Sequence, residues 1–279
     1  EILAMAMSPT YDPNRYDEYP AENRRITAVA DSFPPGSTFK PITAAAALES
    51  GAVTVNDTFY CGGSTRVLSE TLYCHVTSGH GSQTFAEVIM NSCNIGFIQI
   101  AQRTGIENFY KYLDLLGATS TTGIDLPGEV SGILPAEKDA TALDLACMSY
   151  GQTLQLTPIQ LITSMSAIAN GGYTVVPHVV KQITDIDGNV VEEKPSSIVR
   201  RVISQKTSDE LRAALEKVVA EGTGKQAYVP GYRLAGKTGT ANKVINGVLV
   251  QGKYLAWFIG FAPANDPKVA LLVMIDEPK

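Results

Sequence analysis

The stretch GYRLAGKTGTANK, Gly231 to Lys243, decides the fold because it fits two patterns that require different surroundings. From Gly231 it fits G-x-x-x-x-G-K-[ST], a loop that cradles phosphates between a strand and a helix, with Lys237 and Thr238 in the functional positions. From Lys237 it reads Lys-Thr-Gly-Thr, which belongs on a strand and requires two further elements earlier in the chain. The residues around this stretch and upstream of it distinguish the two interpretations.

The phosphate-loop interpretation needs a strand before the first glycine and a helix after the threonine. The residues before Gly231 are QAYVP, a poor strand that contains Pro230. The residues after Thr240 are ANKVINGVLVQGKYLAWFIGF, in which an Asn246-Gly247 turn stands between two β-rich segments. We therefore reject a P-loop NTPase, because the helix that would complete its phosphate site is missing.

The composition indicates a globular chain with a substantial core. Of 279 residues, 44% are hydrophobic and 18% are charged, which is enough for one large domain or two small ones. The net charge of −6 comes without a basic run, which argues against nucleic acid as the main partner. The apolar stretch Tyr254 to Ala262 is too short to span a bilayer. Because the chain begins in EILAMAMS without an initiator Met, we expect it to be an excised domain.

Helix start and stop signals predict helices in the middle of the chain. They consist of Ser or Thr caps, Pro in the first turn and Gly after the last turn. Two capping boxes, Thr84-x-x-Glu87 and Thr207-x-x-Glu210, mark further starts. The expected helices cover residues 41–50, 84–91, 106–117, 157–170 and 207–222.

Strand signals stand at the two chain ends. ILAMAMS (residues 2–8) opens the chain, and YLAWFIGFA (254–262) and VALLVMID (269–276) close it. A small hairpin, KQITDIDGNVV, turns at Asp187-Gly188. We expect an α/β (α+β) fold in one domain, residues 1–279, with an antiparallel sheet completed by both chain ends and flanked by helices. A helical part, roughly residues 41–180, is inserted between the sheet-forming ends.

The two further elements that Lys-Thr-Gly-Thr requires are present and in the right order. PPGSTFKPITAAAALESG supplies Ser37 and Lys40, whose i, i+3 spacing puts both side chains on one helix face. A neutral amine there can take the serine proton, and the helix N-terminus favours the developing anion. VIMNSCNIGF supplies Ser92 and Asn94, the second element. Each match alone is weak, but three in order make coincidence unlikely as an explanation.

The chain resembles the transpeptidase domain of a class B penicillin-binding protein, of the Gram-positive septal-division and spore-cortex type. The resemblance runs nearly end to end and includes ILAMAMSPTYDPN, PPGSTFKPITAAAALE, GHGSQTFAEVIMNSCN, TGIDLPGE, YGQTLQLTPIQLITSMSAIANGG, AGKTGTA and FIGFAPANDP. It implies the penicillin-binding transpeptidase and serine β-lactamase-like fold. Members are held at the extracytoplasmic face of the bacterial membrane by an N-terminal helix and a pedestal domain, both absent from this sequence. They act in cell-wall synthesis complexes with a glycosyltransferase.

The resemblance also implies a mechanism. Ser37 would attack the penultimate D-Ala carbonyl of a peptidoglycan stem peptide, and the acyl-enzyme would pass to an amine of a neighbouring stem; β-lactams would acylate the same serine. Lys40 would be the general base. Ser92 would relay a proton to the leaving nitrogen, and Asn94 would orient Lys40 and the substrate amide.

The third element would bind the substrate. The resemblance implies that Lys237 supplies a positive field and that the hydroxyls of Thr238 and Thr240 bind the terminal carboxylate. The backbone N–H groups of Ser37 and Thr240 would form the oxyanion hole. Gly239 fits a strand that the substrate must approach closely.

Related activities stay open as alternatives. A class A β-lactamase clears its acyl-enzyme with a Glu in Glu-x-x-Leu-Asn, and that string does not occur here, so the penicillin adduct should be long-lived. A D,D-carboxypeptidase or a β-lactam sensor domain shares the three motifs. A non-catalytic binding module is disfavoured, because Ser37 and Lys40 are both present. The chemistry itself requires no cofactor.

Thiols and imidazoles crowd one region of the chain. The residues from Cys61 to Cys93 include three of the four cysteines and two of the three histidines. Thiolate and imidazole together suit a structural Zn²⁺, which usually takes four ligands. The favoured ligands are a subset of Cys74, Cys93, Cys61 and a neighbouring histidine, His75 or His80. Alternatively, His80 is structural in its GHG turn, and Cys61 and Cys74 form a disulfide or stay as free buried thiols.

Overall fold

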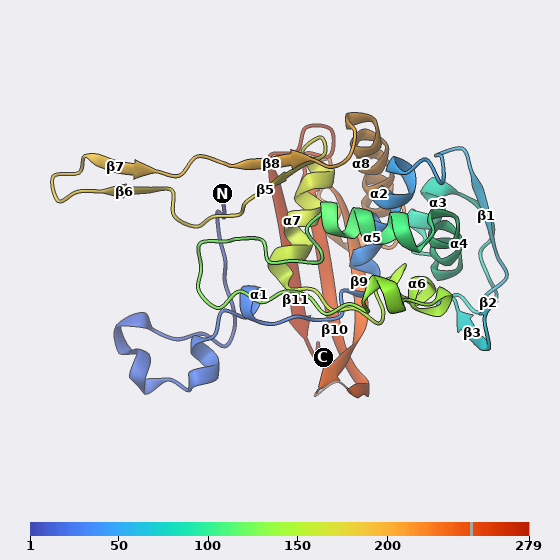
Figure 1. Cartoon of the computed structure of the whole chain (residues 1–279), viewed down its shortest axis with the longest axis horizontal. Coiled ribbons are helices and arrows are strands. Elements are labelled where there is room, and N and C mark those ends of the chain that lie inside the picture. Colours follow the sequence, from blue (N-terminus) through green and yellow to red (C-terminus); the bar gives the residue numbers. More distant parts are fainter. Residues whose placement is uncertain (246–247, 279) are drawn as a thin grey trace.

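The central sheet is built from the C-terminal part of the chain. A computed structural model describes residues 1–245 and 248–278. Three antiparallel strands, β9 (Ala235–Ile245), β10 (Val248–Ala262) and β11 (Val269–Asp276), form a sheet in the order β11-β10-β9 (Figure 1). The two strands predicted at the C-terminal end are therefore confirmed. The predicted Asn246-Gly247 turn lies outside the described residues.

Residues 235–243 of the stretch GYRLAGKTGTANK lie on β9, an outer strand of this sheet. Lys237 is opposite Ile259 of β10, and Gly239 is opposite Trp257. β9 continues as a strand beyond Thr240 to Ile245, so no helix begins where a phosphate loop would need one. The structure confirms the rejection of the P-loop interpretation.

The predicted N-terminal strand is wrong among the described residues. Residues 2–8 run alongside the body of the protein without strand pairing, and the Ile2 N–H donates to the carbonyl of His178 at 2.8 Å. Ile2 and Met5 pack against a small cluster of Val29, Ile124 and Ile159. The apolar run ILAMAMS therefore packs partly against the body of the protein, which a chain can do without pairing as a strand.

Helices cover the sheet and form a lobe beside it. α7 packs on β10 and β11, α8 packs on β9, and α2 packs against α4, α5, α7 and α8 (Figure 1). The α-helices are α1 (Thr27–Ala30), α2 (Lys40–Glu49), α3 (Phe85–Met90), α4 (Asn94–Thr104), α5 (Ile106–Leu115), α6 (Ala142–Met148), α7 (Pro158–Ala169) and α8 (Gln205–Ala220). Short 3₁₀ helices are η1 (Pro13–Glu18), η2 (Ala21–Arg24), η3 (Gly36–Phe39), η4 (Glu137–Asp139) and η5 (Lys225–Ala227). None of the described helices is long and apolar enough to cross a membrane.

Two of the predicted helix starts are confirmed by their caps, and one is wrong. The capping box of Thr84 and Glu87 forms as expected at the start of α3. Thr157 caps α7, with Pro158 in the first turn. α8, however, begins at Gln205 with Ser204 as its cap, so Thr207 lies inside the helix.

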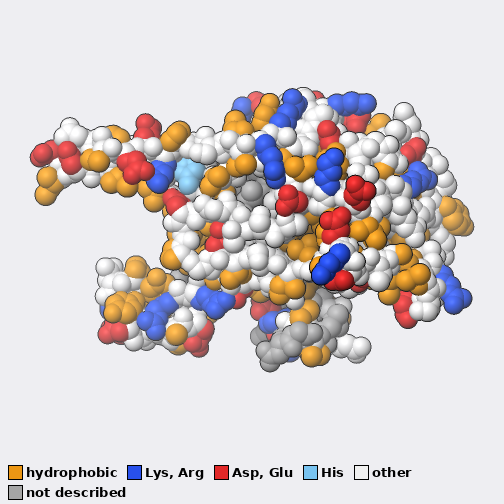
Figure 2. Space-filling view, in the orientation of Figure 1, with side chains coloured by type: hydrophobic (Ala, Val, Ile, Leu, Met, Phe, Trp, Pro, Cys, Tyr) orange, Lys and Arg blue, Asp and Glu red, His pale blue; other side chains and the backbone are white. Residues whose placement is uncertain are grey.

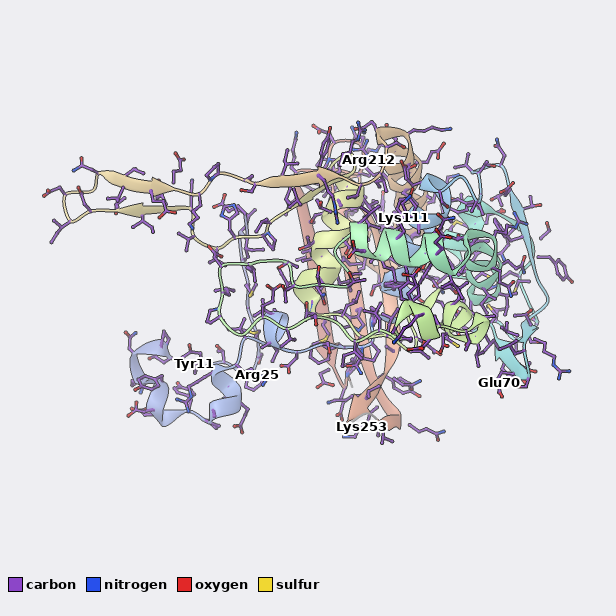
Figure 3. All side chains as sticks on the ribbon, in the orientation of Figure 1. Tyr11, Arg25, Glu70, Lys111, Arg212 and Lys253 are labelled. Carbon is purple, nitrogen blue, oxygen red and sulfur yellow. The ribbon has the colours of Figure 1, made fainter. Side chains whose placement is uncertain are left out.

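Small strand pairs extend the molecule at its two ends. β1 (Thr58–Cys61) pairs with β4 (Gly81–Thr84), and β2 (Ser64–Val67) pairs with β3 (Glu70–Tyr73), next to Glu70 in Figure 3. At the opposite end the expected hairpin, β6 (Gln182–Thr184) and β7 (Val190–Glu193), projects from the body, while β5 (Tyr173–Val175) pairs with β8 (Ile198–Arg201). On the face shown in Figure 2, positive and negative side chains are interspersed.

The buried core joins the helices to the sheet and fixes the segment that carries Ser37. The alanines Ala44 to Ala47 of α2 are fully buried, which lets neighbouring helices approach closely. Just before α2, η3 packs directly against β9. Gly36 has φ +52°, and a Cβ there would lie 2.8 Å from the carbonyl oxygen of Thr240. Glycine is therefore needed to bring η3 against the Lys-Thr-Gly-Thr strand.

Candidate active site

A cleft of about 820 Å³ lies where the three sequence elements meet. Its walls come from η3, the turn between α3 and α4, β9, and the loop that follows α6. The residues that line it are Pro34, Gly36, Ser37, His75, Ser92, Asn94, Ile133, Tyr150, Gln152, Thr153, Leu154, Gln155, Thr223, Thr238, Gly239, Thr240, Ala241, Asn242 and Val244.

Ser37 lies on η3 at the base of this cleft, and its side chain is half-buried. Lys40 begins α2 three residues later and is fully buried. The expected Ala-rich helix therefore starts at the lysine, and a 3₁₀ turn carries the serine. The predicted placement of both residues at the mouth of one helix is what the structure shows.

Lys40 joins the first element to the second. Its Nζ donates to the Ser92 carbonyl oxygen at 2.7 Å, lies 3.0 Å from Ser92 Oγ and donates to Asn94 Oδ1 at 2.8 Å. Residues more than fifty positions apart in the chain thus meet at one amine. Three oxygen contacts hold the amine in place beneath the cleft.

Burial changes the acid–base behaviour of Lys40. Desolvation, followed by repulsion from Lys237, lowers the pKa of Lys40 well below its usual value of 10.5. Lys40 therefore becomes neutral at a much lower pH than an exposed lysine does. The neutral amine is the form that accepts a proton. A buried general base at this position is chemically competent.

The turn between α3 and α4 presents Ser92 and Asn94 to Lys40. Ser92 adopts φ +53°, a left-handed conformation that is uncommon for residues other than glycine. Cys93 caps α4, and its Sγ accepts a hydrogen bond from the Gly96 N–H at 3.3 Å. Asn94 Nδ2 donates to the Tyr73 carbonyl at 3.2 Å, so its oxygen faces Lys40. The side-chain amide of Asn94 is therefore hydrogen-bonded through both its oxygen and its nitrogen.

Lys237 is the second buried amine of the site. Its side chain is fully buried on β9, and its Nζ donates to the Thr238 carbonyl at 2.9 Å. Desolvation lowers the pKa of Lys237 to about 7. Near neutral pH this group therefore changes between a cation and a neutral amine.

The substrate-binding residues predicted on β9 line the cleft, but Gly239 has a more specific role than expected. A Cβ at Gly239 would lie 2.9 Å from Thr38 Cγ2 and 3.0 Å from the carbonyl oxygen of Pro35. The close neighbour is thus the segment that carries Ser37. Thr238 and Thr240, in contrast, open onto the cleft itself.

The sequence interpretation missed part of the cleft wall. Thr223 lies beside Thr238, with their Oγ1 atoms 3.5 Å apart. The loop Tyr150–Gln155 forms the opposite wall. Its YGQTLQ string contributed to the family resemblance, and that string could have assigned the loop to the site. No local signal marked Thr223, which lies in a loop after α8.

The cleft offers no acid that could activate water. None of the lining residues, all of which belong to the described part of the chain, is an Asp or a Glu. An acyl-enzyme formed on Ser37 would therefore lack the carboxylate that β-lactamases use for hydrolysis.

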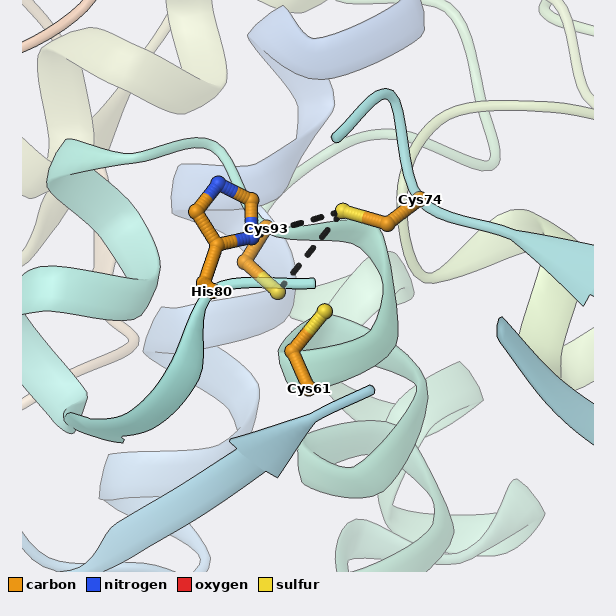
Figure 4. Close-up of side chains that lie close together, drawn as sticks. All are labelled: Cys61, Cys74, His80 and Cys93. Carbon is orange, nitrogen blue, oxygen red and sulfur yellow. Dashed lines mark hydrogen bonds between the residues drawn. The ribbon is translucent and has the colours of Figure 1, made fainter. Parts of the chain in front are cut away.

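The cysteine- and histidine-rich segments meet next to the second element. Cys61, Cys74, His80 and Cys93 converge from separate segments, as Figure 4 shows. His75 is different: it is exposed and lines the cleft. A hydrogen bond between Cys74 and Cys93 lowers the pKa of Cys74 and raises that of Cys93.

Comparison with known proteins agrees with this geometry. The family model described as penicillin binding protein transpeptidase domain matches residues 1–279. Stage V sporulation protein D of Bacillus subtilis is 43% identical over 282 residues, which cover 100% of this chain and 44% of that protein. Penicillin-binding protein PbpB of Mycolicibacterium smegmatis is 35% identical over 290 residues, covering 100% of this chain and 44% of that protein.

Solved structures show the same fold. Penicillin-binding protein 3 of Mycobacterium tuberculosis, complexed with aztreonam, has a TM-score of 0.86 and 32% identity, covering 96% of this chain and 61% of that one. The D,D-transpeptidase domain of a peptidoglycan glycosyltransferase from Eggerthella lenta has a TM-score of 0.88 and 26% identity, covering 98% and 70%.

The chain therefore belongs to the penicillin-binding protein transpeptidase domain family, as its motifs predicted, and it has the serine β-lactamase-like fold of that family. It spans less than half of the length of the curated relatives described above.

Proposed function

We propose that this chain is the catalytic domain of a serine-type peptidoglycan D,D-transpeptidase. The observation that carries the proposal is the convergence on Lys40: one buried amine, three residues after Ser37, contacts both Ser92 and Asn94. The cleft above it is also lined by the Lys-Thr-Gly-Thr strand. A relative from Mesostigma viride, 33% identical to this chain, is named peptidoglycan D,D-transpeptidase FtsI homolog.

In the acylation step, Ser37 Oγ attacks the penultimate D-Ala carbonyl carbon, and Lys40 Nζ takes the hydroxyl proton. Charge that develops on the carbonyl oxygen is stabilised by the backbone N–H groups of Ser37 and Thr240. The C–N bond then breaks as Ser92 passes a proton to the leaving nitrogen and takes one back from Lys40, with which it is in contact at 3.0 Å. The terminal D-Ala departs, and Lys40 is again neutral. An ester on Ser37 remains.

In the transfer step, an amine of a second stem peptide attacks the ester carbonyl and loses a proton to Lys40. The new amide leaves, and Ser37 regains its proton. Lys237, in its protonated form, and the hydroxyls of Thr238 and Thr240 hold the carboxylate of the donor stem before acylation. β-Lactams carry a comparable carboxylate and would acylate Ser37 in the same way.

Two related functions use the same acylation step, a D,D-carboxypeptidase and a β-lactam sensor. The proposal is distinguished from both by product analysis with a donor stem ending in D-Ala-D-Ala, with and without an acceptor amine. A transpeptidase yields the cross-linked amide when acceptor is present. Hydrolysed stem alone would indicate a carboxypeptidase, and a stable adduct without turnover would indicate a sensor.

The setting of the full-length protein is part of the proposal. We infer that the domain works at the extracytoplasmic face of a bacterial membrane, anchored by sequence outside this chain and acting in a cell-wall synthesis complex with a glycosyltransferase. The support is the family membership and the partial coverage of its relatives. The Bacillus subtilis relative is named for sporulation, whereas a vegetative division role fits the same chemistry.

The assignment of the nucleophile is tested by intact-mass measurement with penicillin. The unmodified chain should gain the mass of one penicillin, and Ser37→Ala should gain none. Ser50→Ala is the matched control, because Ser50 caps the C-terminal end of α2, the helix that follows Ser37, and does not line the cleft. An adduct that persists in Ser37→Ala would overturn the assignment.

A further inference from the structure

Four potential metal ligands converge beside the active-site turn from segments that are separate in the fold. Cys61 ends β1, Cys74 follows β3, His80 precedes β4, and Cys93 caps α4. Their ligand atoms all lie within 4.8 Å of one another (Figure 4). The three cysteines are buried, and His80 is half-buried. Three thiols and one imidazole thus form a single compact group of donors.

The two shortest contacts in the cluster match the spacing of a tetrahedral site. Zinc bonds of about 2.3 Å to sulfur and about 2.05 Å to nitrogen place two tetrahedral sulfurs ~3.8 Å apart and a sulfur ~3.6 Å from a nitrogen. Cys74 Sγ lies 3.9 Å from Cys93 Sγ and 3.6 Å from His80 Nδ1. These three ligand atoms are therefore already spaced as around a Zn²⁺ ion, and every other pair of ligand atoms lies within 4.8 Å.

The backbone around the cluster is already in place. The Cys74 N–H donates to the Gly63 carbonyl at 2.8 Å, which ties the segment after β1 to the segment after β3. Gly79 has φ +82°, and a Cβ there would lie 2.3 Å from the carbonyl oxygen of Cys61. The loops that carry Cys61 and His80 are thus in direct backbone contact. The site is assembled by the fold and not by the side chains alone.

The geometry decides between the two neighbouring histidines. His75 Nδ1 lies 3.8 Å from Cys74 Sγ, which is comparable with the distance from His80. Only His80, however, belongs to the set in which every ligand atom is close to all others. His75 is exposed and lines the cleft.

We propose that this cluster is a structural zinc site, with Cys61, Cys74, Cys93 and His80 as its four ligands. Thiolate and imidazole donors favour zinc and disfavour Mg²⁺ and Ca²⁺, which prefer oxygen. Four protein ligands leave no open position for water, so the ion holds the fold and takes no part in the reaction. The Gly96 N–H that donates to Cys93 Sγ supplies an outer hydrogen bond to a ligand thiolate.

The zinc site would support catalysis by holding Ser92 and Asn94 in place. Cys93 stands between Ser92 and Asn94, whose oxygens contact the Lys40 amine. Ser92 holds an uncommon left-handed conformation. A metal bond at Cys93 would fix this turn against β1 and β3 and thereby hold both side chains on Lys40. The zinc ligands are positioning residues for the proposed acylation.

Elemental analysis of the purified chain, together with Co²⁺ substitution, tests the site. The unmodified chain should contain roughly one zinc per molecule, and Co²⁺ should give the thiolate charge-transfer and tetrahedral d–d absorption of a sulfur-rich site. Cys74→Ser and His80→Gln should lose the metal. Cys147→Ser and His75→Gln are the matched controls, because Cys147 lies outside the cluster on α6 and His75 faces the cleft.

Several outcomes would overturn the site: a chain that stays metal-free when folded with zinc supplied, iron or copper in its place, or a Cys74–Cys93 disulfide in the metal-free chain. Loss of metal in His75→Gln with retention in His80→Gln would overturn the ligand set. The Co²⁺ spectrum uses the unmodified chain, so it is informative even if a ligand variant does not fold.

The positioning role is tested by chelating the metal at a temperature where far-ultraviolet circular dichroism shows the chain still folded. The penicillin acylation rate constant should fall, by up to about 10²-fold for a displacement of about 1 Å, while the noncovalent dissociation constant stays unchanged. An unchanged rate constant would overturn this role. A zinc-loaded chain without any penicillin adduct would instead refute the proposed function and leave the metal site standing.

Discussion

At the scale of single residues, the site depends on two buried lysines in different surroundings. Lys40 has three oxygens around its amine, from Ser92 and Asn94, whereas Lys237 contacts the Thr238 carbonyl. Burial lowers the pKa of both, and Lys237 further disfavours charge on Lys40. One neutral and one protonated amine is the arrangement that base catalysis and carboxylate binding together require.

Replacing Lys40 should slow acylation without unfolding the chain. In Lys40→Met the apolar stem is retained while the base is lost, so the acylation rate constant should fall roughly 10²–10⁴-fold. Stopped-flow acylation with a chromogenic β-lactam measures this loss. Lys138→Met is the control, because Lys138 is exposed on η4. A Lys40→Met chain that acylates at nearly the original rate would remove Lys40 from the mechanism.

Carboxylate recognition should weaken as the pH rises through about 7, where Lys237 loses its proton. The apparent affinity for a β-lactam carrying a free carboxylate should therefore fall relative to that for its methyl ester. The ratio of the two acylation efficiencies between pH 6 and pH 8.5 measures this effect. Ratios that stay constant over this range would contradict a carboxylate role for Lys237.

The sequence could predict which residues belong to the three elements, but not all of their contacts. Ser37 and Lys40 are three positions apart, so helix geometry relates them directly. The meeting of Lys40 with Asn94 depends on tertiary packing and was supplied by the resemblance. The same limit applies to the histidines: His75 and His80 are equivalent in sequence, and only the fold of the intervening loop selects between them.

At the scale of elements, local signals succeeded where the cap and the helix belong to one short segment. The capping box of Thr84 and Glu87 could be predicted from the sequence because both of its hydrogen bonds join residues three positions apart. The start of α8 was predicted three residues late because Thr207 matches the capping-box pattern, whereas its hydroxyl donates to Glu49 Oε2 of α2 at 2.6 Å and Ser204 caps the helix through the Thr207 N–H. The prediction of an N-terminal strand was wrong because a short apolar run does not reveal whether a partner strand is within reach.

Removing the cap of α8 should destabilise the chain measurably. Ser204→Ala leaves the Thr207 N–H without its 3.2 Å acceptor and deletes a hydrogen bond to Glu49, so the free energy of unfolding should fall by about 0.5–2 kcal/mol. Urea unfolding measures the change. Ser204→Thr keeps the hydroxyl and should lose much less. Equal losses in the two variants would show that the hydroxyl is not what stabilises this helix start.

At the scale of the whole molecule, the cleft is assembled from segments spread over most of the chain. Ser37, Ser92, Tyr150 and Thr240 reach it from η3, the α3–α4 turn, the loop after α6 and β9. Because these contacts are non-local, composition and periodicity could indicate a mixed fold but could not place the cleft. The end-to-end order of the motifs did place the cleft, because it identifies a known fold together with the position of its site. The single-domain assignment and the bounds of the helical part stay predictions.

Buried Lys237 should also make the stability of the whole molecule depend on pH. Its folded pKa is about 7 and its usual value is 10.5, so between these values the unfolded chain binds more protons at this site. The free energy of unfolding should therefore rise with pH in this range, by up to about 1.4 kcal/mol per pH unit, and this dependence should vanish below pH 7.

Comparison with Lys237→Met at pH 7, 8 and 9 isolates this contribution, because the other titrating groups are common to both chains. The stability of the unmodified chain should increase relative to that of Lys237→Met as the pH rises. Lys243→Met is the matched control on the same strand: a hydrogen bond to Asp276 raises the pKa of Lys243, so its contribution is fully present below pH 10.5 and should stay flat from pH 7 to 9. If both variants follow the same pH dependence, the folded pKa of Lys237 is not lowered, and its cation must be stabilised within the protein by a partner.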